Sequence, residues 1–206
     1  MIRRAALLLI ALAPMPAAAL PARHRPAPAT LVRVRLDTSA GPIVIALEMK
    51  RAPITAGNFL AYVDQKKLDG TSFYRAARGK IRPTEGLVQG GINHNMVRSL
   101  VPIAHEPTTV TGIHHVDGTV SMARNAPGTA MGDFFIVVGP AQYLDAVPGA
   151  GGYAGYAAFG HVVSGMAIVR KILAAPTYKG GWSSDTMGQS IIKPVQIISA
   201  HRIAPK

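Results

Sequence analysis

Short apolar stretches bounded by turn residues dominate this chain and leave room for few helices. Apolar residues at helical spacing predict two helices, at residues 55–66 and 164–174. Because strands and helices do not alternate regularly, a doubly wound parallel sheet is disfavoured. We expect a mainly β fold, in which a closed antiparallel barrel carries two helices packed on its outside. The predicted strands cover residues 31–36, 43–47, 72–75, 119–123, 134–138, 158–163 and 193–203.

The ends of the predicted elements carry their own signals. The turn cluster at residues 38–42 should join the first two strands as a hairpin. Thr55 and Ser164 are the expected N-caps of the two helices, because their hydroxyls can accept an unpaired backbone N–H. Pro176 lies just past the second helix, where a residue that cannot continue a helix belongs.

The N-terminus has the three parts of a secretory signal peptide. Arg3 and Arg4 are followed by a short apolar run and by an alanine-rich cleavage site ending at Ala19. The apolar run is too short to span a bilayer. We expect a signal peptide at residues 1–19, a flexible linker at 20–30 and one domain at 31–206. The protein should then be periplasmic or secreted, without stable membrane insertion; a disordered apolar tail is the alternative.

Composition excludes several chemistries. The chain has no cysteine, which rules out disulfides, thiol catalysis and thiolate zinc sites. Its 22 Lys and Arg against 10 Asp and Glu give a net charge of +12, a balance that invites a nucleic-acid or polyanion hypothesis. The basic residues are scattered, however, and no recognition helix accompanies them. We therefore expect a solvated basic surface and no nucleic-acid partner.

The usual catalytic patterns are absent from the sequence. His114 and His115 are neighbours, and neighbours on an extended chain point to opposite faces, so they are poorly placed to chelate one metal ion. Ser121 lacks the glycine that a nucleophile elbow requires after the serine. We expect no metal and no cofactor. A chain of this kind binds a ligand or catalyses a change that breaks no covalent bond.

Four segments, in order along the chain, resemble the signatures of the cyclophilin family, particularly its exported bacterial members. They are residues 38–59, 70–75 with 88–91, 118–124 with 133–136, and 143–145 with 155–166. The resemblance implies the family fold, a closed eight-stranded antiparallel barrel with two packed helices. It also implies peptidyl-prolyl cis-trans isomerase activity, acting on X-Pro bonds in unfolded or exported polypeptides, and a monomer that needs no cofactor.

The resemblance also implies roles for individual residues. Arg75 stands where the family carries its catalytic arginine, whose guanidinium donates a hydrogen bond that favours the twisted amide. The proline pocket maps to Phe73, Leu87, Phe135 and Leu144. Gln89 matches the glutamine that holds the substrate backbone. The remaining substrate-binding residues implied are Ala123, Arg124, Asp133, Tyr143 and Tyr156.

Three of the departures from the family pattern bear most directly on activity and ligand binding. Gly86 falls where a pocket phenylalanine is usual, so one aromatic wall is missing. Asp133 replaces a glutamine and is expected either to order Arg75 or to bind it in a salt bridge. Tyr143 stands at the variable tryptophan position, which implies weak cyclosporin binding. The first two departures leave a second hypothesis open, a cyclophilin-fold peptide-binding module or chaperone with low activity.

Overall fold

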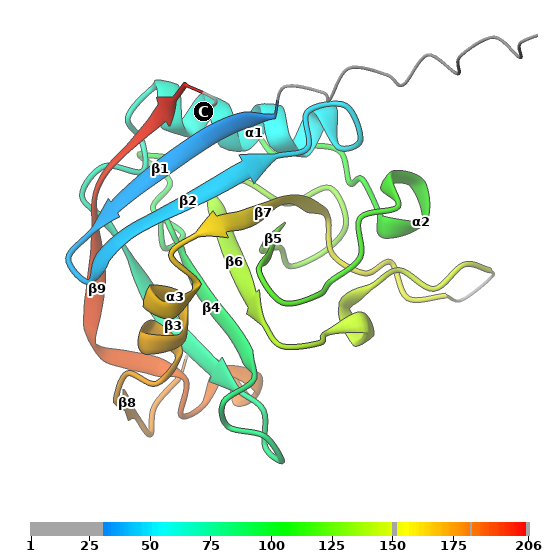
Figure 1. Cartoon of the computed structure of the whole chain (residues 1–206). Helices are drawn as coiled ribbons and strands as arrows, with labels where there is room; N and C mark the ends of the chain where they lie inside the picture. The colour runs from blue at the N-terminus through cyan, green and yellow to red at the C-terminus, as the bar shows by residue number, and fades with distance from the viewer. Residues whose placement is uncertain (1–30, 150–151, 182, 205–206) are drawn as a thin grey trace, which may run out of the picture.

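The computed structural model describes residues 31–149, 152–181 and 183–204, so the expected signal peptide and linker lie outside the described residues (Figure 1). The elements are β1 (Val32–Thr38), β2 (Gly41–Leu47), α1 (Pro53–Asp64), β3 (Thr71–Arg78), β4 (Gly86–Gly91), α2 (Thr108–Thr111), β5 (Thr119–Met122), β6 (Asp133–Val138), β7 (Ala158–Ser164), α3 (Met166–Leu173), β8 (Thr177–Tyr178) and β9 (Ser190–Ile203). Two 3₁₀ turns, Gln142–Leu144 and Ser184–Thr186, lie in the loops.

Eight of these strands close into a barrel. The sheet order is β1-β2-β7-β5-β6-β4-β3-β9-β8, and β1 also pairs with β9, which joins the two ends. Every one of these strand pairings is antiparallel, and the two-residue β8 extends from β9 outside the ring. The expected closed eight-stranded antiparallel barrel with two packed helices, α1 and α3, is confirmed; the one-turn α2 is an addition.

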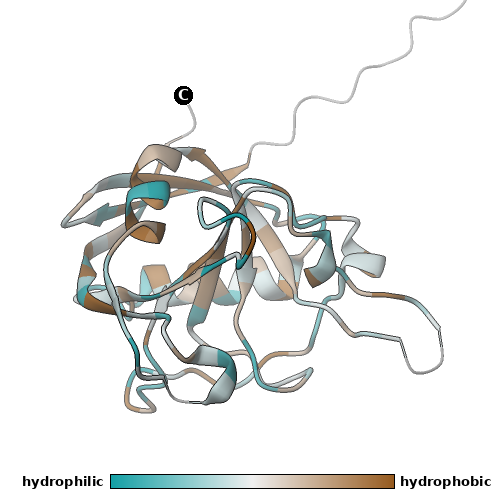
Figure 2. Cartoon of the chain, turned by 90° about the horizontal axis from the view of Figure 1, so that it is seen from below, coloured by the Kyte–Doolittle hydropathy of each residue, from teal (hydrophilic) through white to brown (hydrophobic). Residues whose placement is uncertain are grey.

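The barrel interior and the inner face of α1 form the main hydrophobic core. Alternate residues of β1 and β2 are fully buried, as strand periodicity requires. Phe59 of α1 contacts Phe134 and Phe159, with ring centroids 5.2 and 5.1 Å apart. Figure 2 shows hydrophobic stretches along the strands of the barrel, interrupted by hydrophilic ones. Aromatic pairs of this kind add about 0.5–1.5 kcal/mol each beyond the apolar area they bury.

The expected N-cap of the first helix is wrong. Helix α1 begins at Pro53, two residues before Thr55, because proline has no N–H to satisfy in a first turn. The free N–H groups of Ile54 and Thr55 donate instead to the carboxylate of Glu106, at 3.2 and 2.7 Å. The Thr55 hydroxyl donates to the same carboxylate at 2.6 Å. A residue about fifty positions away in sequence therefore caps α1.

The expected N-cap of the second helix is also wrong. Ser164 is the last residue of β7, and Gly165 precedes α3 with φ of 96°, a left-handed conformation that glycine adopts without strain. At the other end of α3, Arg78 of β3 donates hydrogen bonds to the carbonyls of Leu173 and Ala175. A cation at a helix C-terminus also offsets the negative end of the helix dipole. Arg78 thereby fixes α3 against β3.

Candidate active site

A β-bulge in β3 determines which side chains face the site. Phe73 pairs with Gly90 and Arg75 pairs with Gln89, so Tyr74 is one extra residue in the register of β3 against β4. In a regular strand, residues two apart share a face; one extra residue moves the second to the opposite face. Phe73 is consequently fully buried in the barrel core, whereas Arg75 lines a cavity on the outside.

Two hydrogen-bonded side chains orient Arg75 from β3 and β4. The Nη1 of Arg75 donates to Oε1 of Gln89 at 2.7 Å, and Nε2 of Gln89 donates to the Tyr74 hydroxyl at 2.8 Å. The bond to Tyr74 fixes the amide of Gln89, so that its carbonyl faces the guanidinium. Burial lowers the pKa of Arg75 from its usual value, but a guanidinium stays protonated in proteins. Gln89, expected to hold a substrate backbone, here holds the arginine.

Gln189 contacts the same guanidinium from the far end of the chain. The Nε of Arg75 donates to Oε1 of Gln189 at 2.8 Å, and Nε2 of Gln189 donates to the carbonyl of Asp185, also at 2.8 Å. The pairing of β3 with β9, which sets Arg75 opposite Ser190, brings Gln189 into reach. Local sequence reasoning missed this residue, because only a strand pairing across 114 positions reveals it.

An apolar floor lies beside Arg75. Phe135 and Leu144 are 3% and 7% exposed, and they form a small hydrophobic cluster separate from the main core. Leu87, Ala123 and Tyr156 pack against this cluster. A cavity of about 790 Å³ connects these side chains with Arg75. Nine of the ten expected substrate-binding residues line this cavity; they are Leu87, Gln89, Ala123, Arg124, Asp133, Phe135, Tyr143, Leu144 and Tyr156. Phe73, in the barrel core, is the exception.

The rim of the cavity combines aromatic rings with a cation. The Tyr156 ring meets Phe135 edge-on, with centroids 5.3 Å apart. The guanidinium of Arg124 lies 4.8 Å from the centroid of the Tyr156 ring and donates a hydrogen bond to the carbonyl of Gly155. Tyr143 is 68% exposed at the opening. A cation–π contact of this kind restrains both partners.

Asp133 does not bind Arg75 in a salt bridge. Its two carboxylate oxygens accept hydrogen bonds from the backbone N–H groups of Asn93 and His94, at 2.7 and 3.1 Å. Both of those residues have positive φ, 52° and 59°, so the carboxylate stabilises a tight left-handed turn. Asp133 also shares a hydrogen bond with the Tyr74 side chain, which binds Gln89, so the other expectation, that Asp133 helps to order Arg75, stays a prediction.

The backbone at Gly86 has no room for the phenylalanine that is usual at this position. Its φ is 143°, and a Cβ at this position would lie 2.1 Å from the carbonyl oxygen of Ala77. The backbones of β3 and β4 therefore approach too closely for any side chain. Gly86, Arg78 and Gly79 all line the cavity, which has no aromatic side chain at Gly86.

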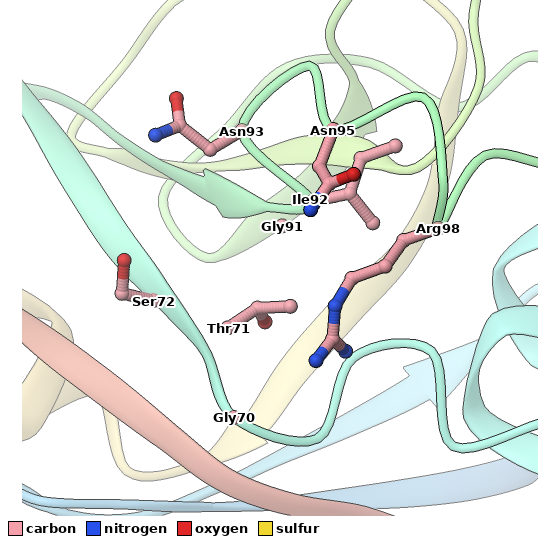
Figure 3. Close-up of a pocket in the computed structure, with 8 residues that line it drawn as sticks. All are labelled: Gly70, Thr71, Ser72, Gly91, Ile92, Asn93, Asn95 and Arg98. Carbon is pink, nitrogen blue, oxygen red and sulfur yellow. The ribbon is translucent and has the colours of Figure 1, made fainter.

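A second pocket, of about 300 Å³, lies where β3 begins and β4 ends (Figure 3). Arg98 reaches across it, and Nη1 of Arg98 donates to the carbonyls of Lys67 and Asp69 at 3.0 and 2.8 Å. Asn93 and Asn95 line the same pocket, and both are exposed. With Ile92 as its one large apolar side chain, it offers no floor for a proline ring.

Most of the sequence matches a known family. A family model described as cyclophilin type peptidyl-prolyl cis-trans isomerase/CLD matches residues 33–202. The chain belongs to the cyclophilin family. Its activity is that of a peptidyl-prolyl cis-trans isomerase, which confirms the function expected from the sequence.

Curated relatives of this cyclophilin carry the same description. A peptidyl-prolyl cis-trans isomerase of Acinetobacter baylyi is 37% identical, over 81% of this chain and 82% of the relative. One from Streptomyces antibioticus is 34% identical, over 77% of this chain and 93% of the relative. Peptidyl-prolyl cis-trans isomerase B of Escherichia coli is 32% identical, over 77% and 94%.

A solved structure supports the fold of this cyclophilin. A cyclophilin type isomerase from Cryptosporidium parvum aligns with a TM-score of 0.63 and 18% identity, over 85% of this chain and 99% of that one. At this identity the likeness concerns the barrel alone. Among the described residues, no three His, Asp or Glu gather as a metal site, and no helix has the length and apolar character to cross a membrane.

Proposed function

We propose that Arg75 is the catalytic residue of this cyclophilin and that Phe135, Leu144 and their neighbours receive the proline ring. The observation that carries the proposal is the placement of a cation, held by two glutamines, at the edge of an apolar cavity. Nε and Nη1 of the guanidinium are engaged, and the described residues offer Nη2 no hydrogen-bond partner. That nitrogen is the donor available to a bound peptide.

The reaction needs what this site provides. Amide resonance sets a rotation barrier of about 20 kcal/mol, and a twisted X-Pro amide loses that resonance and gains a lone pair on the proline nitrogen. A donor aimed at that nitrogen stabilises the twisted state more than the planar one. A charge-assisted hydrogen bond worth about 1.5–3 kcal/mol corresponds to roughly a 10- to 150-fold rate increase. Exclusion of water by the apolar floor strengthens the same interaction.

A second candidate keeps the fold but reduces the catalysis. The glycine geometry at Gly86 removes one wall of the pocket, and this favours a peptide-binding module or chaperone of low activity. The two candidates differ in rate, because a module without catalysis binds an X-Pro peptide but does not accelerate its isomerisation.

Isomerisation of a short X-Pro peptide, followed for the wild type and for Arg75→Ala, separates the candidates. The proposal expects a clear acceleration by the wild type and a loss of at least about tenfold in Arg75→Ala. Arg33→Ala is the matched control, since Arg33 lies on β1 and does not line the cavity. Equal rates for wild type and Arg75→Ala, both near the uncatalysed rate, would establish the binding module.

We further propose that this cyclophilin is exported and acts on polypeptides that fold outside the cytoplasm, in the periplasm or medium. The support is the three-part pattern of residues 1–19: a basic start, a short apolar run and an alanine-rich cleavage site. Such clients would be proline-containing chains in an unfolded state, for which X-Pro isomerisation limits the folding rate.

Fractionation of a Gram-negative host that expresses the full chain tests the export proposal. The expected product is a periplasmic protein that lacks residues 1–19 by mass spectrometry. Ala19→Arg should block cleavage, and Ala13→Val, outside the cleavage site, should not. An uncleaved wild-type chain confined to the cytoplasm would contradict the proposal.

A further inference from the structure

A buried hydrogen-bonded chain of three side chains lies beneath the proline pocket. Oγ of Ser121 is 2.9 Å from Nε2 of His115, and Nδ1 of His115 is 2.5 Å from Oδ1 of Asp145. Ser121 and His115 are both fully buried. Asp145 also accepts the backbone N–H of His115 at 3.0 Å, and Nδ1 of His114 lies 2.8 Å from its other oxygen.

The chemistry of the partners sets the protonation of the imidazole. A carboxylate only accepts, so Nδ1 of His115 carries the proton and Nε2 accepts from the Ser121 hydroxyl. Burial lowers the pKa of His115 and outweighs the opposing effect of Asp145, which keeps the ring neutral. The pKa of Asp145 is also lowered: burial raises it, but hydrogen bonds from His115 and His114 lower it more. A neutral ring with both nitrogens paired is inexpensive to bury.

The order serine, histidine, aspartate resembles a hydrolase triad, but its burial excludes that chemistry. A nucleophile must touch its substrate, and the side chain of Ser121 has no exposed surface. The residues that flank Ser121 in β5 are buried as well. The chain of hydrogen bonds must therefore act on the protein itself.

Each member of the chain is connected to a different wall of the pocket. Asp145 directly follows Leu144, and Ser121 lies two residues before Ala123. The His115 ring stacks on Phe135, with centroids 6.1 Å apart and ring planes 16° from parallel. Ser121 also pairs with Phe135 across β5 and β6. One imidazole thus contacts or anchors three segments that form the apolar floor.

We propose that His115 is a positioning residue, whose bridge from Ser121 to Asp145 beneath Phe135 holds the walls of the proline pocket at the separation that binds a proline ring. The inference rests on the proposed location of the proline pocket. It assigns a role to a histidine and a serine that touch no substrate. The proposed role of His115 affects how tightly the proline ring binds, whereas the rotation of the amide depends on Arg75.

Ser121→Ala is the sharpest test, because it removes the hydroxyl donor from the buried chain with almost no change in volume. Peptide affinity is measured by NMR titration with a short X-Pro peptide, and the on-enzyme isomerisation rate by exchange spectroscopy at saturation. We expect the affinity to fall about three- to tenfold, with the saturated rate within about twofold of wild type. His115→Phe, which keeps a flat ring against Phe135 but no hydrogen bonds, should show the same pattern.

Thr55→Ala is the matched control for stability alone. Its hydroxyl also donates to a buried carboxylate, at the start of α1 and outside the cavity. It should lower the melting temperature but leave the peptide affinity unchanged. Affinity within about twofold of wild type in Ser121→Ala, or an equal loss in Thr55→Ala, would overturn the inference.

Failure of the inference and failure of the proposed mechanism are distinguishable in the same experiment. If Ser121→Ala binds normally while Arg75→Ala loses catalysis, the role of His115 is refuted and the arginine mechanism stands. If Arg75→Ala isomerises the peptide at the wild-type rate while Ser121→Ala binds weakly, the arginine mechanism is refuted and the pocket role of His115 stands.

Discussion

The contact between Gln189 and the proposed catalytic guanidinium leads to a quantitative prediction. Gln189→Ala removes the acceptor that lies 2.8 Å from Nε of Arg75 and leaves Gln89, at 2.7 Å, as the one side chain that orients it. A hydrogen bond to a charged group contributes about 1.5–3 kcal/mol, and water can replace part of it because Gln189 is half-buried. We take the lower end, which corresponds to about a tenfold fall in kcat/KM.

The assay is isomerisation of a short X-Pro peptide, with thermal unfolding measured in parallel. The free energy of unfolding should change by less than about 1 kcal/mol, since Gln189 lies in a loop outside the core. Gln196→Ala is the matched control, because Gln196 is exposed on β9 and its side-chain amide donates to the carbonyl of Pro194 at 3.4 Å, away from Arg75. If Gln189→Ala keeps its kcat/KM within about twofold, or loses no more than Gln196→Ala, the positioning role is refuted.

Three further predictions concern stability and ligand binding. Glu106→Ala leaves two backbone N–H groups of α1 without their acceptor and should cost about 2–3 kcal/mol in urea unfolding; a loss below about 0.5 kcal/mol would contradict the capping role. Burial lowers the pKa of His115 below 6.5, so the unfolded chain takes up a proton before the folded one does. The free energy of unfolding should therefore fall as pH drops below about 6.5, and less steeply in His115→Phe; equal slopes would contradict this. Because Tyr143 lacks an indole donor, cyclosporin should bind weakly, and a nanomolar dissociation constant by calorimetry would refute that expectation.

Strand periodicity predicted most of the barrel, but local signals failed where long-range contacts decide the outcome. Strand β4 is not among the strands predicted from the sequence, because three of its six residues are glycine and glycine weakens any strand pattern. Thr55 is a good cap in isolation, yet the remote carboxylate of Glu106 and the start at Pro53 determine where α1 begins. These outcomes depend on the closed barrel rather than on neighbouring residues.

For the candidate site, the sequence indicated which residues line the cavity but not the long-range contacts between them. Arg75 and nine of the ten substrate-binding residues implied by the family resemblance line one cavity, and their roles in catalysis and binding stay predictions. The resemblance also implied that Phe73 lines the pocket, whereas the bulge in β3 leaves Phe73 in the barrel core; a bulge of this kind is not visible in the sequence. Gln189 and the bridge through His115 required the strand pairings themselves.

The central claim is that a fixed cation beside an apolar slot lowers the cost of twisting the X-Pro amide. Exchange spectroscopy on a saturating peptide measures that step directly, because it reports the interconversion of bound cis and trans forms apart from binding. For Arg75→Ala, we predict a bound-state exchange rate about 10- to 150-fold below wild type, with the peptide dissociation constant changed by less than about threefold. A bound-state exchange rate equal to that of the wild type, with weaker binding as the whole effect, would contradict the account.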